Sequence, residues 1–277
     1  MAGKKVTKTE GGALAAPSFM DEDRRKGTES LGNEDFEVPR VKLLQATSSE
    51  VQDYDEAEPG QFWHDVTNEP LGEELLVVPV WVDRRFLLWR PLDDGGGILA
   101  RADDGRHWQP SSGEFLVKLK GVKKPVTWTL APTVAESGLG EWGSSNPEDE
   151  DSPPAATLTY TYVCVMPDRP ELGPMVFSLS VSSAKVAKKW QSAINMSRAP
   201  SFGQRFKLSS FMDNNSSNQD YFNYRPVADG FVQDEDEYAE YKGFYEAFRD
   251  AGVRIKDEDR GQDDTASDDT PDGAPSI

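Results

Sequence analysis

The sequence predicts an α+β fold built mainly from antiparallel β-strands. Short segments with an apolar residue at every second position recur along residues 38–225, and turns rich in glycine, proline and aspartate separate them. Two segments, 183–196 and 234–251, repeat their apolar residues at helical spacing instead. The order of strands, helix, strands and helix is typical of an α+β domain. We expect an OB-like Greek-key barrel with insertions and two peripheral helices, and the large number of strands leaves a β-sandwich open.

Composition divides the chain into three parts. Residues 1–35 are rich in small and charged side chains without periodicity, which predicts a disordered N-terminal arm. Residues 36–253 form the predicted β-rich globular core. Residues 254–277 are predicted to be a disordered acidic tail, because they hold too few apolar side chains to fold.

The first half of the core is predicted to consist of strands and turns. Pro79 lies inside the most β-like segment, and it predicts an edge position or a bulge there. Glycine-rich turns follow at 93–97 and 103–105. Residues 136–156 predict a long, mobile polar loop. The predicted strands cover residues 38–44, 75–89, 98–101, 115–119 and 126–130.

The second half adds both helices. Ser182 or Ser183 can cap the helix at 183–196, in which Trp190 belongs to an apolar stripe and is predicted to be buried. The helix at 234–251 begins with acidic residues, which suit its dipole, and carries five aromatic residues on its predicted buried face. Further strands are predicted at residues 157–166, 176–182, 205–211 and 221–225.

The negative charge is unevenly distributed. The net charge is −19, and residues 231–277, with 5 basic and 15 acidic side chains, contribute −10 of it. Residues 61–230 carry 17 basic and 21 acidic side chains and are nearly balanced. The low isoelectric point therefore does not exclude an anionic partner such as nucleic acid.

The sequence argues against an enzyme, a cofactor or a membrane span. It contains no phosphate-binding loop, dinucleotide fingerprint, nucleophile elbow or H-E-x-x-H motif. Asp103-Asp104 beside Gly105 predicts a turn more than a metal pair. The chain has one cysteine, Cys164, and two histidines, which are few potential ligands for a zinc site. The single cysteine fits a reducing cytoplasm. No run of about 18 apolar residues is present, so no transmembrane helix is expected.

Three segments, 81–90, 115–128 and 181–210, combine cations with aromatic residues. Single-stranded nucleic acid is held by cations that follow its phosphates and by aromatic rings that stack on its bases. Solvated cations and core aromatics are the competing interpretation. The candidate phosphate-binding residues are Arg84, Arg85, Arg90, Lys118, Lys120, Lys123, Lys124, Lys185, Lys188, Lys189, Arg205 and Lys207. The candidate stacking residues are Trp81, Trp89, Trp108, Trp128 and Phe206.

Five short motifs carry a resemblance to phage proteins. They are VPRVKLLQ at 38–45, PGQF at 59–62, GGGILARADDGR at 95–106, AESGL at 135–139 and GFVQD at 230–234. With these motifs the chain resembles a family of tailed-phage early proteins over roughly residues 36–253. In layout, with an OB-type core and an acidic tail, it also resembles phage single-stranded DNA-binding proteins. The resemblance implies residence in the host bacterial cytoplasm, and replication or recombination proteins as partners of the tail.

Two functions follow as hypotheses. The first is a sequence-independent single-stranded DNA-binding protein of phage replication or recombination. The alternative is a virion or host-takeover adaptor that binds a host protein through its acidic surface. A nuclease using Asp103 and a metal is a weaker third possibility.

Overall fold

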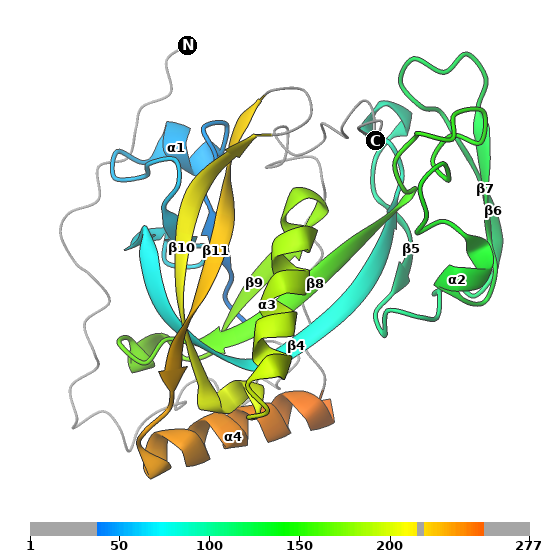
Figure 1. The fold of residues 1–277 in the computed structure, drawn as a ribbon. Helices are drawn as coiled ribbons and strands as arrows, with labels where there is room; N and C mark the ends of the chain where they lie inside the picture. Colours follow the sequence, from blue (N-terminus) through cyan, green and yellow to red (C-terminus); the bar gives the residue numbers. More distant parts are fainter. Residues whose placement is uncertain (1–37, 215–218, 252–277) are drawn as a thin grey trace, which may run out of the picture.

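A computed structural model describes residues 38–214 and 219–251 (Figure 1). The predicted arm at 1–35 and the predicted tail at 254–277 lie outside the described residues. One large sheet organises the rest, with strands in the order β11–β10–β4–β8–β9 and with β5 paired to the far end of β4. All of these pairings are antiparallel, which confirms the predicted α+β class. The strands are β4 (Glu74–Trp89), β5 (Ile98–Ala102), β8 (Ala156–Val165), β9 (Met175–Ser180), β10 (Gln204–Asn214) and β11 (Asp220–Phe231).

The long strand β4 connects the two ends of the molecule. It spans 16 residues, pairs with β10 at its start and with β5 at its end, and pairs with β8 over most of its length. The register with β8 shifts between Pro79 and Trp81, so the predicted irregularity at Pro79 is a bulge. Proline cannot donate to the ladder, and the strand bends where the ladder is interrupted. Figure 1 shows β4 as a curved ribbon.

Beyond the bulge, successive side chains of β4 point to opposite faces of the sheet. We call these the α3 face and the α4 face, after the helix that packs on each. The α3 face carries the β4 residues Val82, Arg84, Phe86 and Leu88, opposite Tyr162, Tyr160, Leu158 and Ala156 of β8. The α4 face carries Trp81, Asp83 and Arg85, opposite Val163, Thr161 and Thr159.

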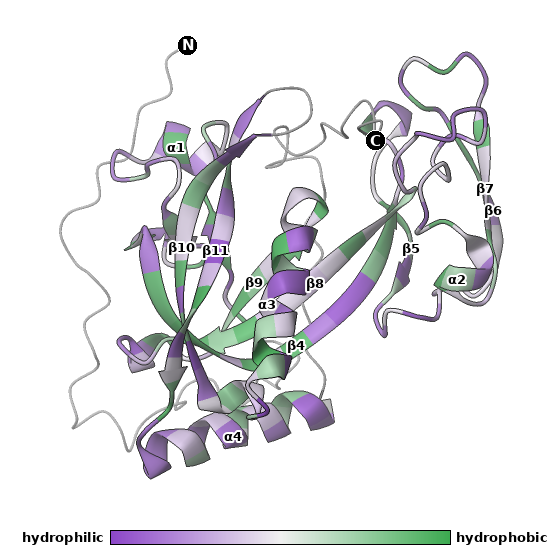
Figure 2. Ribbon diagram, viewed as in Figure 1, coloured by the Kyte–Doolittle hydropathy of each residue, from purple (hydrophilic) through white to green (hydrophobic). Residues whose placement is uncertain are grey.

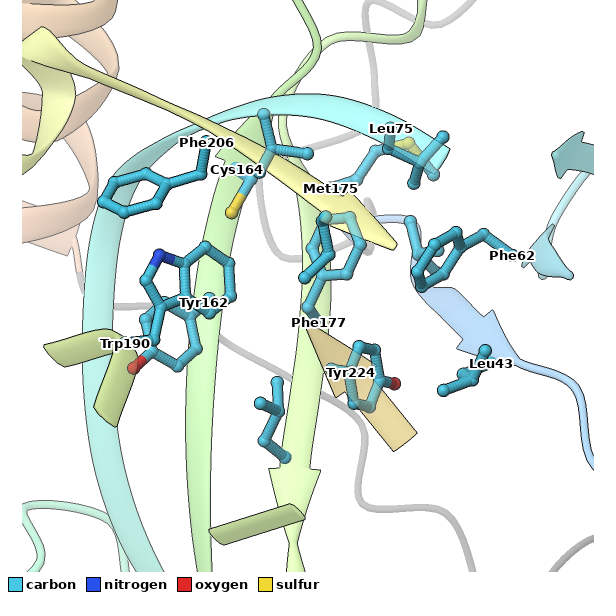
Figure 3. Close-up of a cluster of buried hydrophobic side chains, with 14 of the residues drawn as sticks. Leu43, Phe62, Leu75, Tyr162, Cys164, Met175, Phe177, Trp190, Phe206 and Tyr224 are labelled. Atoms are coloured by element: carbon cyan, nitrogen blue, oxygen red, sulfur yellow. The ribbon is translucent and has the colours of Figure 1, made fainter. Parts of the chain in front are cut away.

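The helix α3 (Ala184–Met196) covers the main hydrophobic core. Trp190, predicted to be a core residue, is 1% exposed and stacks on Tyr162 with ring centroids 4.1 Å apart and planes 9° apart. Phe206 of β10 meets the same indole edge-on at 5.7 Å (Figure 3). The Tyr162 hydroxyl donates a hydrogen bond to the Ala187 carbonyl oxygen at 2.8 Å. One tryptophan therefore fixes the helix to the centre of the sheet.

The helix α4 (Glu235–Ala251) covers the other face of the same sheet. Tyr241 is buried, and Phe244, Tyr245 and Phe248 pack partly buried against a cluster of valines from β4, β8 and β9. The predicted aromatic face of this helix is confirmed, although Tyr238 packs on Phe202, with ring centroids 5.3 Å apart, and stays partly exposed.

A second hydrophobic cluster lies at the far end of β4 and β8. The hairpin of β6 (Gly113–Val117) and β7 (Val126–Leu130) packs on Leu88 and Ala156 through Val117 and Trp128. The short helix α2 (Val134–Ser137) follows, and the prediction missed it. Its signal was present, because Thr133 and Glu136 form a capping box.

A three-stranded sheet of β1 (Val41–Leu43), β2 (Phe62–His64) and β3 (Glu69–Gly72) lies beside β11, with α1 (Ser49–Asp53) in its first connection. Only the first of these elements was predicted. The Gln45 side chain joins this sheet to β11: its Nε2 donates to the Phe222 carbonyl at 3.0 Å, and its Oε1 accepts from the Phe222 N–H at 2.8 Å. These elements are too short to show periodicity.

Two expectations need correction. No sheet closes into a barrel within residues 38–214 and 219–251: β11 and β9 are the outer strands of an open sheet, and helices cover both of its faces. The predicted mobile loop at 136–156 is held by hydrogen bonds. The Gly143 N–H donates to the Ser152 carbonyl at 2.6 Å, and the Trp128 Nε1 donates to the Ser145 carbonyl at 3.0 Å.

Candidate nucleic-acid interface

Three lysines of α3 form the first exposed basic cluster, which we call the α3 lysines: Lys185, Lys188 and Lys189. Their spacing of three and four residues places them on one side of the helix. Trp190 and Ile194 lie on the other side and are buried. Burial of the apolar stripe therefore turns the lysines to solvent, and α3 itself contains no acidic residue.

Four lysines at the turn between β6 and β7 form the second cluster, which we call the hairpin lysines: Lys118, Lys120, Lys123 and Lys124. All four are exposed. No carboxylate occurs in the sequence between Phe115 and Ala135, so the turn has a net positive charge.

Both clusters belong to elements that pack on the α3 face. The helix α3 packs there on Tyr162 through Trp190, and the hairpin packs there on Ala156 and Leu88. Arg84 and Tyr160, paired across the ladder, occupy the same face between these contacts. Arg84 is exposed and Tyr160 is half-buried. Figure 2 shows this part of β4 as a hydrophilic stretch between α3 and β5.

The Arg84 side chain is held by the neighbouring turn. Its guanidinium donates to the Gly105 carbonyl at 3.4 Å, and its Cζ lies 6.0 Å from the centre of the Phe86 ring. Gly105 has a φ of +67°, and a Cβ there would lie 2.6 Å from the Arg84 carbonyl oxygen. Only glycine fits this approach, so the Asp-Asp-Gly turn positions the cation.

Arg205 and Lys207 do not belong to this surface. They alternate along β10 with the buried Phe206 and Leu208, which face α3, and so they point to the α4 face. Each has its cationic nitrogen 3.9 Å from a carboxylate oxygen of Asp229 on β11. The 181–210 segment therefore divides its cations between opposite faces of the sheet.

Two arginines of the first basic segment are also placed elsewhere. Arg85 follows Arg84 and points to the α4 face. Arg90 donates to Asp94 Oδ2 at 3.0 Å within the turn after β4. Of the arginines proposed to bind phosphate, Arg84 alone lies on the α3 face between the two lysine clusters.

Three of the five predicted stacking residues are core residues, and this corrects their proposed role. Trp108, Trp128 and Phe206 are 1%, 3% and 1% exposed. Trp108 Nε1 donates to Ser137 Oγ at 3.0 Å, so its polar edge is also occupied. A base cannot stack on a ring whose faces are already packed, and these residues therefore leave the candidate interface.

The other two predicted stacking residues are half-buried. Trp81 points to the α4 face and packs on Tyr245, with ring centroids 6.0 Å apart. Trp89 ends β4, beyond the bulge that shifts its register with β5. Tyr160 and Phe86, both half-buried on the α3 face beside Arg84, are the aromatic residues that the sequence analysis did not select. Tyr160 and Tyr162 occupy alternate positions of the strand predicted at 157–166 and share one face of it, but α3 covers Tyr162 and leaves Tyr160 half-buried.

A polar network joins the start of α3 to the β10–β11 hairpin. Asp213 Oδ2 accepts hydrogen bonds from the Tyr221 hydroxyl and the Asn223 amide, each at 3.1 Å. Burial would raise the pKa of Asp213, but these bonds and the charge of Lys185 lower it. The Ser183 hydroxyl donates to Asn223 Oδ1 at 2.9 Å and makes no cap hydrogen bond, which corrects its predicted capping role.

The turn beside Arg84 contains an acid–histidine pair. Asp104 Oδ1 accepts the N–H groups of Arg106 and His107, and Oδ2 lies 2.5 Å from His107 Nδ1. Burial alone would raise the pKa of Asp104, but these contacts with His107 and Arg106 lower it to about 2. In the described part of the chain, no group of three or more histidine, cysteine or acidic side chains could hold a metal ion.

None of the helices within residues 38–214 and 219–251 is long and apolar enough to cross a membrane. A family model described as Pam3 phage gp34-like protein matches residues 8–254, and the chain belongs to this family. The phage part of the resemblance found in the sequence is thereby confirmed. No curated protein and no solved structure matches the chain.

Proposed function

We propose that this member of the Pam3 phage gp34-like family binds single-stranded DNA without sequence preference across the α3 face of β4 and β8. One observation carries the proposal. The two exposed lysine clusters belong to elements that pack on the same face of the sheet, and the exposed Arg84 lies between them. A flexible polyanion can follow such a surface from one cluster to the next.

The chemistry of these side chains suits phosphate contact more than base recognition. Lysine ammonium groups neutralise phosphates as point charges, and each neutralised phosphate releases condensed counterions. Tyr160 and Phe86 each offer a partly exposed ring for a base, and stacking tolerates any sequence. The expected binding is therefore sequence-independent, steeply salt-dependent and free of any cofactor.

A phage replication or recombination role in the host cytoplasm follows from this activity, with replication or recombination proteins as further partners. We infer that the chain acts by binding and not by catalysis. DNA bound on the α3 face would lie on the opposite side of the sheet from the acidic helix α4.

The test is a titration of labelled oligo-dT with the full chain at several salt concentrations. We expect the logarithm of the association constant to fall linearly with the logarithm of the salt concentration. A quadruple Lys→Glu variant of the hairpin lysines should lose affinity at low salt. Its control is the matched Glu148→Lys, Asp149→Lys, Glu150→Lys and Asp151→Lys variant, which changes four exposed charges of the 136–156 loop. No binding of oligo-dT at any salt concentration overturns the proposal.

A second function is favoured by one further observation. Trp142 is 55% exposed on the loop that hydrogen bonds hold in place, and Glu141 precedes it. A rigid, exposed tryptophan among carboxylates suits a protein partner with a basic rim, because tryptophan is enriched at binding hot spots. This is the adaptor function, which binds a host protein through an acidic surface.

The substitution Trp142→Ala distinguishes the two functions. We expect Trp142→Ala to remove a stoichiometric host protein that copurifies with the tagged full chain, while its affinity for oligo-dT stays unchanged. Retention of every copurifying protein by Trp142→Ala contradicts the adaptor function. Loss of oligo-dT binding in Trp142→Ala contradicts the separation of the two surfaces.

A further inference from the structure

The hairpin of β6 and β7 forms a separate two-stranded sheet, so each of its strands has an outer edge. Figure 1 shows this hairpin at the right-hand margin of the molecule. Within the described residues, β7 is the one strand that pairs with β6, and no isolated bridge joins another segment to residues 113–117. The outer edge of β6 therefore presents backbone N–H and C=O groups to which a further strand can be added.

Three other outer strands are blocked as pairing sites. Proline lacks the N–H that a ladder needs, and it occurs inside β3 as Pro70 and inside β11 as Pro226. The outer edge of β9 is already bridged by Arg40. Residues 113–119, in contrast, contain no proline, so every residue along the edge of β6 keeps its N–H.

The outward face of β6 carries an acid, an apolar residue and a base at equal spacing. Glu114 and Leu116 point outwards from the strand, and the alternation continues just beyond its end to Lys118. All three residues are exposed, and Leu116 is 63% exposed. Val117 and Leu119 point the other way and pack in the second hydrophobic cluster. The inward residues therefore fix which side chains the edge presents to solvent.

This outward row is complementary to itself. In an antiparallel pair related by a twofold axis at Leu116, that residue lies opposite its own copy. Glu114 then lies opposite Lys118 of the partner subunit, and the same pair recurs on the other side of the axis. Side chains directly opposite each other have Cβ atoms about 4.5–5.5 Å apart, so the opposite charges attract and the two leucines are in contact. An edge protected by charges of one sign would instead repel its copy.

The edge of β11 has a similar order of charge but is a poorer site. Arg225, Val227 and Asp229 alternate along that strand. The Asp229 carboxylate oxygens already lie 3.9 Å from the cationic nitrogens of two β10 side chains. Pro226 also removes one N–H from the middle of the row. The β6 edge therefore suits a second copy of the chain better than the β11 edge does.

We propose that two copies of the protein form a twofold-symmetric dimer in which their β6 strands pair antiparallel about Leu116. The two hairpins then form one four-stranded sheet in the order β7–β6–β6–β7. A few residues per copy at a strand edge make an interface smaller than about 1,200 Å², so the association is weak and depends on protein concentration. The net charge of −19 on each copy weakens it further. The proposal does not rest on DNA binding, because the dimer is measured without DNA.

Disulfide formation in the full chain tests the position of the axis. Leu116→Cys places a thiol opposite its own copy, within the Cα separation of about 4.4–6.8 Å that a disulfide needs. The control is Thr127→Cys on β7, since Thr127 pairs with Leu116 and is exposed on the same face. In the dimer its two copies are three strand spacings, about 14 Å, apart. Cys164 is buried and stays out of the exchange. We expect Leu116→Cys to form a covalent dimer several-fold faster than Thr127→Cys, and equal rates overturn the proposal.

Sedimentation equilibrium at several protein concentrations tests the charge pairs. Lys118→Glu should lower the association constant about tenfold, because both attractive pairs become repulsive. Adding Glu114→Lys to that variant restores opposite charges and should bring the constant back to within about threefold of the natural chain. Lys120→Glu is the matched control, since it makes the same change of net charge in the exposed turn and should leave the constant nearly unchanged. A natural chain that is monomeric at every concentration, or a double variant that associates no better than Lys118→Glu, overturns the proposal.

Discussion

The two helices α3 and α4 pack on opposite faces of one sheet and differ in almost every other respect. The helix α3 carries three lysines and no acid, whereas α4 carries six acidic and two basic side chains. The sheet therefore separates a face with basic elements from a face with an acidic helix. A net charge of −19 says little about a molecule whose charge is arranged in this way.

The helices also differ in how they are anchored. Trp190 and Ile194 bury α3 deeply in the main core, whereas α4 rests on Tyr241 and on aromatic residues that keep part of their surface in solvent. A short helix with a deeply buried apolar stripe can present a fixed row of cations to a ligand. A longer helix with a broad, shallow contact depends on many smaller contributions.

The anchoring difference predicts the largest effect. Trp190→Ala removes the ring that contacts both Tyr162 and Phe206 and leaves a cavity, so it should lower the free energy of unfolding by about 3–5 kcal/mol. Phe248→Ala on α4 removes a half-buried ring and should cost about 1–2 kcal/mol. Urea denaturation of both variants measures the two losses. Equal losses would show that α4 is anchored as deeply as α3.

The charge difference predicts the second effect. Reversal of the α3 lysines to glutamate should weaken oligo-dT binding by about 10–100-fold at low salt and reduce the salt slope by about 2, since each lost phosphate contact contributes about 0.7. Its control is Glu235→Lys, Asp236→Lys and Glu240→Lys on α4, which leaves the α3 face intact. Fluorescence anisotropy at several salt concentrations gives both quantities. If the α4 variant changes affinity as much as the α3 variant, net charge and not the α3 face controls binding.

Arg84 and Arg85 allow the two faces of the sheet to be compared by single substitutions. They are neighbours in sequence and point to opposite faces of β4. Arg84→Ala should weaken oligo-dT binding about 10-fold, since a hydrogen bond to a charged group contributes about 1.5 kcal/mol or more and about 1.4 kcal/mol is tenfold in affinity. Arg85→Ala should change it by less than about twofold, beyond the general effect of one removed charge. The same anisotropy titration decides, and equal effects would remove Arg84 from the proposed interface.

The sequence predicted the elements better than their arrangement. Apolar spacing identified the long strand at 75–89 and both long helices, because each has enough residues to show its period. The elements β2, β3 and α1 were missed because three to five residues carry no period. The barrel was inferred from the order of strands and helices along the chain, which does not fix which strands pair, and the structure has an open sheet instead.

The candidate site was harder to predict, for a physical reason. Lysine is almost never fully buried, and the α3 lysines and the hairpin lysines are all exposed. Aromatic residues are used both in cores and on surfaces, and Trp108, Trp128 and Phe206 are in cores. The face of the sheet on which a side chain lies also depends on the strand register. Arg84 and Tyr160 share the α3 face because β4 resumes its alternation after the bulge at Pro79. The number of extra residues in a bulge cannot be predicted from the sequence, and it decides which side chains face α3.

The smallest predicted effect concerns the turn that holds Arg84 on the α3 face. Asp104 has a folded pKa of about 2, below the ordinary aspartate value of 3.8, so its contribution to stability is present above pH 3.8 and is lost as the pH falls towards 2. The melting temperature of Asp104→Asn should therefore lie below that of the natural chain by a few degrees at pH 6, and this difference should shrink steadily between pH 4 and pH 2. Asp103→Asn is the control, since its carboxylate accepts neither of the N–H groups that Asp104 accepts from Arg106 and His107. Because Arg84 donates to Gly105 in the same turn, Asp104→Asn should also weaken oligo-dT binding slightly at pH 7, whereas a variant of α4 with similar stability should not. A difference between Asp104→Asn and the natural chain that stays constant from pH 6 to pH 2 would show that the carboxylate charge does not stabilise this turn.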